Sequence, residues 1–118
     1  MGRASREKGC RAEREWAAFL REAGFTDAHR GGQLYQRGST VADVEGLPFI
    51  HVEVKHVEKL NLRAAMEQSM RDATDEGRGR LPIVAHRTNR KPWLVTMKGD
   101  DWIRLFKAAL RGAKQRGA

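Results

Sequence analysis

The segment 50–55 has the clearest pattern in the chain, because its residues alternate between apolar and polar. Successive side chains of a β-strand point to opposite faces, so this alternation predicts a strand. One face carries isoleucine and valine side chains and is able to pack against a core. The other face carries His51, Glu53 and Lys55 and needs a different explanation.

The preceding segment 41–45 alternates in the same way, and Gly46-Leu47-Pro48 between the two segments predicts a turn. In the resulting hairpin Asp43 faces Glu53. Two adjacent carboxylates suit a divalent metal, because Mg²⁺ prefers carboxylate, carbonyl and water oxygens. Lys55, on the same face, is able to position a water molecule or stabilise charge on a phosphate. The simpler alternative is a solvated strand face joined by weak cross-strand ion pairs.

An amphipathic helix is predicted near the N-terminus, where apolar side chains recur every three or four residues. These side chains are Ala12, Trp16, Phe19, Leu20 and Ala23. We expect Gly24 to end this helix. Glu13 lies at the border of the apolar stripe, where it is able to lean toward a site at the sheet edge, although helical glutamates usually face solvent.

The second half of the chain predicts a helix followed by two strands. Asn61 caps the helix, which runs to the glycine-rich loop 77–80. Its predicted packing face consists of Leu62, Met66, Ser69, Met70 and Ala73. The segments 81–86 and 92–97 then have the composition of strands.

A last helix is expected to begin at a cap formed by Asp100 or Asp101. Its apolar face consists of Trp102, Ile103, Phe106, Ala109 and Leu110. We expect these side chains to pack in the core; the alternative is a dimer surface that uses exposed parts of Trp93, Trp102 and Phe106. From about residue 111 the chain is polar and basic, which predicts a tail able to lie along a polyanion such as a nucleic-acid backbone. Together the elements predict an α/β fold with a central mixed sheet flanked by helices.

The whole chain of 118 residues fits one domain with one compact core, since 40% of its residues are hydrophobic. Its 23 Lys and Arg against 15 Asp and Glu give a formal net charge of +8, which favours a polyanionic partner. No hydrophobic run approaches the ~20 residues of a membrane span. The N-terminus lacks the apolar core of a signal peptide, so we expect a cytoplasmic protein without a membrane partner.

Several other kinds of site find no support in the sequence. Cys10 is the only cysteine, which excludes an intramolecular disulfide and a thiolate zinc cluster. The four histidines, at positions 29, 51, 56 and 86, lack paired metal-ligand spacing. No Gly-x-Ser-x-Gly element indicates a serine hydrolase, and no phosphate-binding glycine-rich loop indicates a nucleotide cofactor.

An ordered set of residues resembles the PD-(D/E)XK nuclease superfamily, and most closely its Holliday-junction resolvases from archaea and phages. The set comprises Lys8-Gly9, Ala12-Glu13-Arg14-Glu15, Gly24-Phe25, Arg30, Gly38-Ser39, Asp43 and Glu53-Val54-Lys55. Glu-x-Lys alone is a weak signal, whereas the ordered set is much more specific. The likeness covers the first half of the chain, and Ala42 stands where the motif's name has proline.

The resemblance implies a restriction-endonuclease-like fold with an αβββαβ core. It implies that Glu13, Asp43 and Glu53 are metal ligands, with the backbone carbonyl of Val54 as a further contact. Lys55 corresponds to the catalytic lysine. The implied cofactor is Mg²⁺, for which Mn²⁺ substitutes.

Other site residues have weaker support. Ser39 is either a loop hydroxyl near the scissile phosphate or an ordinary turn serine. Gln68 matches a helical glutamine that approaches the active site in several related nucleases, with a solvent-facing glutamine as the alternative. Contacts with DNA phosphates are expected from Arg30, Arg37, Arg87, Arg90 and Lys91. The basic connector 87–91 serves solubility equally well.

The expected function is a metal-dependent, structure-selective DNA endonuclease that hydrolyses phosphodiester bonds, as a phage-type Holliday-junction resolvase does. Two symmetric nicks are needed at a four-way junction, so a homodimer is implied. The expected setting is a bacterial or archaeal cell, with the gene belonging to the host or to a phage. Two alternatives stay open: a superfamily nuclease for linear, nicked or replication-associated DNA, and a basic DNA-binding module that keeps the fold without cleaving.

Overall fold

The computed structural model describes residues 3–31 and 42–117 of the chain. Two predicted site residues, Arg37 and Ser39, lie outside these ranges. The described strands are β1 (His29–Arg30), β2 (Val44–Glu45), β3 (Ile50–Lys55), β4 (Leu81–His86) and β5 (Leu94–Met97). The described helices are α1 (Arg3–Glu22), α2 (Leu62–Glu76) and α3 (Gly99–Gln115).

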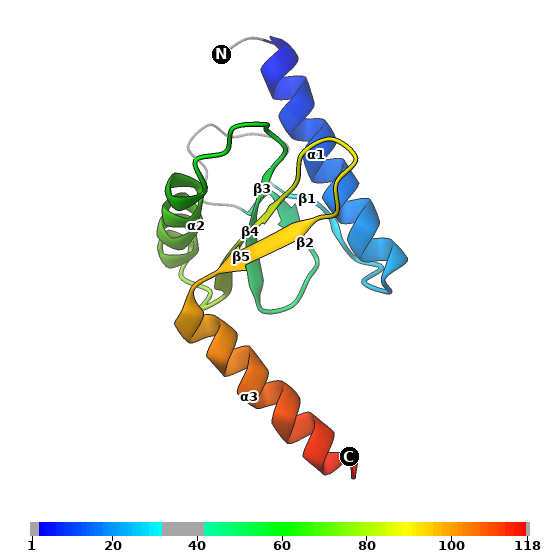
Figure 1. The fold of residues 1–118 in the computed structure, drawn as a ribbon, viewed down its shortest axis with the longest axis vertical. Coiled ribbons are helices and arrows are strands. Elements are labelled where there is room, and N and C mark those ends of the chain that lie inside the picture. The colour runs from blue at the N-terminus through cyan, green and yellow to red at the C-terminus, as the bar shows by residue number, and fades with distance from the viewer. Residues whose placement is uncertain (1–2, 32–41, 118) are drawn as a thin grey trace.

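The five described strands form one mixed sheet in the order β1-β2-β3-β4-β5 (Figure 1). Strands β3 and β4 pair in parallel, and the other neighbours pair antiparallel. The predicted α/β class with a central mixed sheet flanked by helices is confirmed. Strands β3 and β4 have the predicted bounds, whereas β2 and β5 are shorter than predicted and the two-residue β1 was not predicted.

Helix α1 covers one face of the sheet. Its buried side chains are Ala12, Trp16, Ala17 and Leu20, and they pack in one cluster with Val44, Val52, Val54, Ile83 and Ala85. The prediction that Phe19 belongs to the buried stripe is wrong, because Phe19 is 48% exposed and stacks on Trp16 at the rim of the cluster. Gly24 follows the helix with a φ of 108°, which agrees with the predicted stop.

Helix α2 covers the opposite face and has the predicted ends. Asn61 Oδ1 accepts the N–H of Ala64 at 3.0 Å, and Gly77 adopts the left-handed conformation just after the last turn. The buried face is, however, rotated from the predicted one. It consists of Ala65, Ser69 and Ala73.

The predicted core positions Met66 and Met70 are wrong, because both side chains are only half-buried. Small side chains allow α2 to approach the sheet closely, so alanine and serine replace methionine in the contact. The Ser69 hydroxyl donates to the carbonyl of Ile83 at 2.9 Å, which ties the helix directly to β4. The methionines lie instead beside a cleft between α2 and the end of β5.

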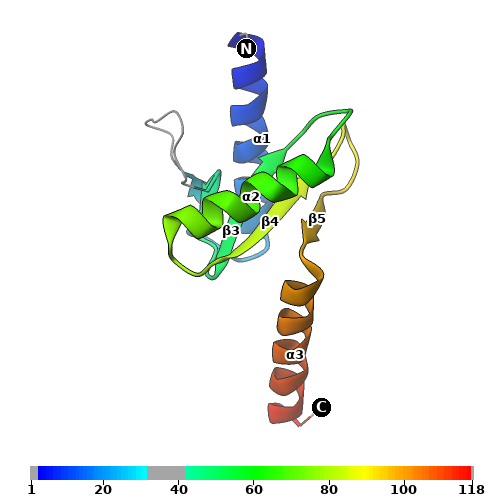
Figure 2. The ribbon, with the colours of Figure 1, turned by 90° about the vertical axis from the view of Figure 1, so that its left-hand side faces the viewer.

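Helix α3 projects away from the sheet in both views (Figures 1 and 2). The prediction that its apolar face packs in the core is therefore wrong: Trp102 is 56% exposed and Phe106 is 50% exposed. The apolar spacing predicts the helix itself correctly. It does not specify the direction of the chain after β5, which points the helix away from the sheet. Trp93, in contrast, is half-buried against Trp16 at a ring distance of 5.1 Å.

Two predictions about the ends of α3 are also wrong. The helix begins at Gly99, so Lys98 occupies the N-cap position, and its side chain has no acceptor for a cap bond. The Asp101 carboxylate is bound to Arg104 at 2.6 Å. Both aspartates lie in the first turn. The predicted tail from about residue 111 is helical through Gln115. None of the helices in the described ranges combines the length and apolar character that a membrane crossing requires.

Candidate functional site

The predicted carboxylate pair is held at the junction of β2 and β3. Asp43 precedes β2, and its backbone N–H donates to the carbonyl of Val52 at 3.0 Å. Its side chain continues the pairing, because Oδ2 accepts the N–H of Val54 at 2.8 Å. Val44 pairs with Val52, so Asp43 stands opposite Glu53, as the hairpin prediction required.

Glu53 and Lys55 lie on the same face of β3 and contact each other. The distance from Lys55 Nζ to Glu53 Oε2 is 3.3 Å, and the Glu53 side chain is buried while that of Lys55 is 32% exposed. The ammonium group is therefore at the mouth of the site and the carboxylate is inside it. This arrangement agrees with the predicted shared face.

Glu13 approaches from α1 but is held by a different partner. Its Oε1 accepts the Arg30 Nε–H at 2.9 Å, and a second Arg30 nitrogen donates to Cys10 Sγ at 3.1 Å. Arg30, predicted to contact phosphate, thus connects β1 to α1. Glu13 is nevertheless close enough to Asp43 for its negative charge to raise the pKa of that carboxyl.

Burial and mutual repulsion shape the electrostatics of this cluster. Burial, followed by the charges of Glu53 and Glu13, raises the pKa of Asp43 well above its ordinary value, although the Val54 N–H and Lys55 oppose the shift. Burial also raises the pKa of Glu53, and Lys55 offsets part of that rise. Ionising both carboxylates is costly without additional positive charge.

These residues fit a divalent metal in their chemistry. Hard carboxylate oxygens are the ligands that Mg²⁺ prefers, and a cation would offset the burial and the repulsion that together raise the pKa of Asp43. Among the described residues, no three Asp, Glu, His or Cys side chains are already arranged around one metal position. Glu13 is bound to Arg30 and Glu53 to Lys55, so these carboxylates must turn to bind one ion together.

A cleft of about 370 Å³ begins at Lys55 and continues along α2. Gln68 lines it, so the structure brings the weakly predicted glutamine and the lysine to one cavity. Lys59 and Arg71 line it as well, and neither residue belongs to a motif of the sequence. The sequence spacing contains a signal for Arg71, because this residue follows Gln68 by three positions and therefore lies on the same side of the helix.

The predicted phosphate contacts of the β4–β5 connector differ in their surroundings. Arg87 is bound to Glu15 at 2.7 Å, and its guanidinium lies over the Trp93 ring at 4.6 Å. Arg90 and Lys91 are exposed at the tip of the connector. Only these last two keep their charges available to a ligand outside the protein.

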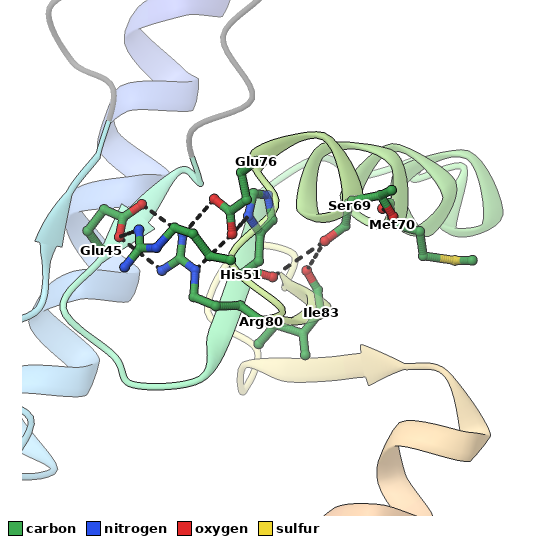
Figure 3. A network of polar contacts seen from close by, with 9 residues as sticks. Glu45, His51, Ser69, Met70, Glu76, Arg80 and Ile83 are labelled. Atoms are coloured by element: carbon green, nitrogen blue, oxygen red, sulfur yellow. Dashed lines mark hydrogen bonds and ion pairs between the residues drawn. The ribbon is translucent and has the colours of Figure 1, made fainter.

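His51 shares the face of Glu53 but belongs to a separate cluster (Figure 3). Its Nδ1 lies 3.1 Å from Glu76 Oε1. Arg80 donates to Glu76 at 2.8 Å and forms a two-pronged contact with Glu45 at 3.0 and 3.1 Å. The His51 side chain is buried, and it acts on the Asp43 cluster through its charge, which lowers the pKa of Glu53.

Neither a protein-family model, nor a curated protein, nor a solved structure matches this chain. The resemblance to PD-(D/E)XK nucleases therefore depends on the ordered motif residues alone. The Val54 carbonyl as a metal contact and the catalytic role of Lys55 stay predictions.

Proposed function

We propose that this protein is a metal-dependent, structure-selective DNA endonuclease with a restriction-endonuclease-like fold, and that its substrate is a branched DNA such as a four-way junction. The observation that carries the proposal is the convergence of Asp43, Glu53 and Lys55 at one end of β3, with Glu13 beside them. The order of elements from α1 to β4 agrees with the αβββαβ core that the motifs imply.

Each side chain of the cluster has a role in this mechanism. Asp43 and Glu53 would hold Mg²⁺, and Glu13 and the Val54 carbonyl are the further candidate ligands. A bound metal would supply the positive charge that polarises the phosphate and lowers the pKa of the attacking water. Lys55 Nζ, at the exposed mouth of the site, orients that water or neutralises the charge that develops on the phosphate.

The basic surroundings support DNA as the substrate. Lys59 and Arg71 line the cleft that starts at Lys55, and Arg90 and Lys91 are exposed at the β4–β5 connector. Their positive charges attract a polyanion regardless of its sequence. The preference for a junction over linear DNA depends on the resemblance to resolvases.

A second candidate function is a DNA-binding module that does not cleave. The pairs Arg30–Glu13 and Lys55–Glu53 favour it, because both occupy carboxylates that a catalytic metal needs. If these pairs persist when Mg²⁺ is present, the protein binds DNA through its basic surface alone.

Cleavage of end-labelled synthetic DNAs distinguishes these functions. A four-way junction, a splayed arm, a nicked duplex and a linear duplex are each incubated with Mg²⁺ or Mn²⁺. We expect paired symmetric nicks in the junction and none in linear DNA. Glu53→Gln should abolish cleavage while DNA affinity persists, because the amide keeps the shape of the side chain and loses the charge that binds the metal.

Glu58→Gln is the matched control, since Glu58 is exposed on the loop that follows β3. It should cleave like the wild type. Equal cutting of all four DNAs would replace the resolvase assignment with a general nuclease. Binding without cleavage under every metal condition would favour the non-catalytic module.

A further inference from the structure

Helix α3 stands apart from the other described elements (Figures 1 and 2), and its apolar face is exposed. Its large apolar side chains are between 43% and 56% exposed. They are Trp102, Ile103, Leu105, Phe106 and Leu110. The Trp102 and Phe106 rings stack nearly parallel, with centroids 5.4 Å apart, and so form one continuous apolar surface.

The area of this face is large for an isolated chain. A Trp or Phe side chain buries roughly 150–250 Å² when covered, so the five side chains leave on the order of 500 Å² exposed. That equals the largest apolar patch of a typical monomer, which commonly marks an interaction site. Two such faces in contact would bury about 1,000 Å² in total, the lower limit for a specific protein interface.

We propose that α3 binds α3 of a second copy of this chain, antiparallel and around a twofold axis near Phe106 and Ala109. A twofold axis perpendicular to a helix places its copy antiparallel, and the same patch then serves both partners. Trp102 of each chain lies near Ala113 of the other, so each large ring meets a small side chain. This inference concerns association and is independent of the proposed nuclease activity.

The charges along α3 favour the antiparallel direction. In the first turn Asp100 and Asp101 are offset by Lys98 and Arg104, both of which contact Asp101, whereas Lys107, Arg111 and Lys114 make the second half of the helix basic. An antiparallel copy places the nearly neutral half of one helix beside the basic half of the other. A parallel copy would place the two basic halves together.

Sedimentation velocity of the full chain, without DNA or metal, tests the association. The chain mass is 13.4 kDa, and we expect the wild type to sediment as a dimer of twice that mass. Ala109→Asp should raise the dimer dissociation constant about 100-fold or more, because it buries a charge at the interface. Phe106→Ala, which adds no charge, should weaken the dimer in the same direction.

Ala108→Asp is the matched control. Ala108 is the adjacent residue, so it points about 100° away around the helix, outside the apolar face. The substitution has the same charge and helix propensity, and it should change the dissociation constant less than about threefold. Circular dichroism of both variants checks that α3 remains helical.

Disulfide cross-linking in a Cys10→Ser background tests the direction. Chains with Trp102→Cys and chains with Ala113→Cys should cross-link when mixed, and each should cross-link poorly by itself. Efficient cross-linking of Ala113→Cys chains alone would overturn the antiparallel arrangement. A monomeric wild type, equal dimerisation of Ala109→Asp and Ala108→Asp, or binding of a monomer to anionic vesicles through α3 would overturn the proposal.

Discussion

The two ends of β3 carry buried charges on the same face, yet they are balanced differently. At the His51 end, Arg80 lies between Glu76 and Glu45 and binds both (Figure 3). Burial alone would raise the pKa of Glu76, but hydrogen bonds from Arg80 and His51 outweigh it and leave that pKa below its ordinary value. The charges at this end stabilise the fold.

At the other end, burial and repulsion dominate. Among the described residues, Arg30 pairs with Glu13 and Lys55 pairs with Glu53, and the pKa values of Asp43 and Glu53 are nevertheless raised. An excess of buried negative charge is unfavourable for folding and favourable for binding a cation. The two ends therefore differ in whether their buried carboxylates are matched by cations of the fold.

The largest expected effect on stability comes from removing Arg80, the cation that balances the carboxylates at the His51 end of β3. Arg80→Ala should lower the free energy of unfolding by about 3–5 kcal/mol, because it leaves Glu76 buried without a cation. Arg78→Ala is the matched control: Arg78 contacts the same Glu45, but its side chain is 60% exposed, so the loss should stay below about 1 kcal/mol. Urea denaturation measures both.

The pH dependence of Arg80→Ala sharpens the same test. The pKa of Glu76 is lowered in the folded protein, so its contribution is present above the unfolded carboxyl pKa of about 4.3 and is lost as the pH falls below it. The gap between wild type and Arg80→Ala should therefore narrow in acid. A gap that is constant from pH 7 to pH 3 would mean that Arg80 acts by packing instead of charge.

The next effect concerns chemistry at the unbalanced end. Lys55→Ala should slow single-turnover cleavage by about 100- to 1,000-fold, because it removes the cation that stabilises developing charge on the phosphate. Lys59→Ala, in the same cleft, should reduce DNA affinity and leave the single-turnover rate nearly unchanged. Equal rate losses in the two variants would contradict a catalytic role for Lys55.

The smallest expected effect is an increase in stability. Asp43→Asn should stabilise the metal-free protein by about 1 kcal/mol at pH 7, since it removes a buried charge beside two other carboxylates. A raised carboxyl pKa means that stability is lost as pH rises through it, so the gain should disappear in acid. Thermal unfolding with and without Mg²⁺ measures this.

Excess Mg²⁺ provides the control for Asp43→Asn. It should stabilise the wild type by about 2.7 kcal/mol at 100 times its dissociation constant and leave the variant unchanged. Glu45→Gln, at the other end, should lose stability and keep the response to Mg²⁺. A destabilised Asp43→Asn protein would show that Asp43 is mainly a structural residue.

The sequence predicted the local geometry around Glu53 better than the contacts between distant elements. Alternation along 50–55 placed Glu53 and Lys55 on one face, and the hairpin placed Asp43 opposite Glu53; both geometries are confirmed. The capture of Arg87 by Glu15 was not predictable, because those residues come from α1 and the β4–β5 connector. Arg87 and Glu15 are 72 residues apart, so whether they pair depends on how the two elements pack.

The sequence by itself determined the local elements: the bounds of β3 and β4, the caps Asn61 and Gly77 of α2, and the amphipathic character of α3. These follow from strand alternation, helical periodicity and capping, which act within a few residues. Only the tertiary structure decided that Glu53 is buried and that α3 leaves its apolar face uncovered. Both outcomes depend on how elements distant in the sequence meet or fail to meet, and periodicity specifies an apolar face without specifying its partner.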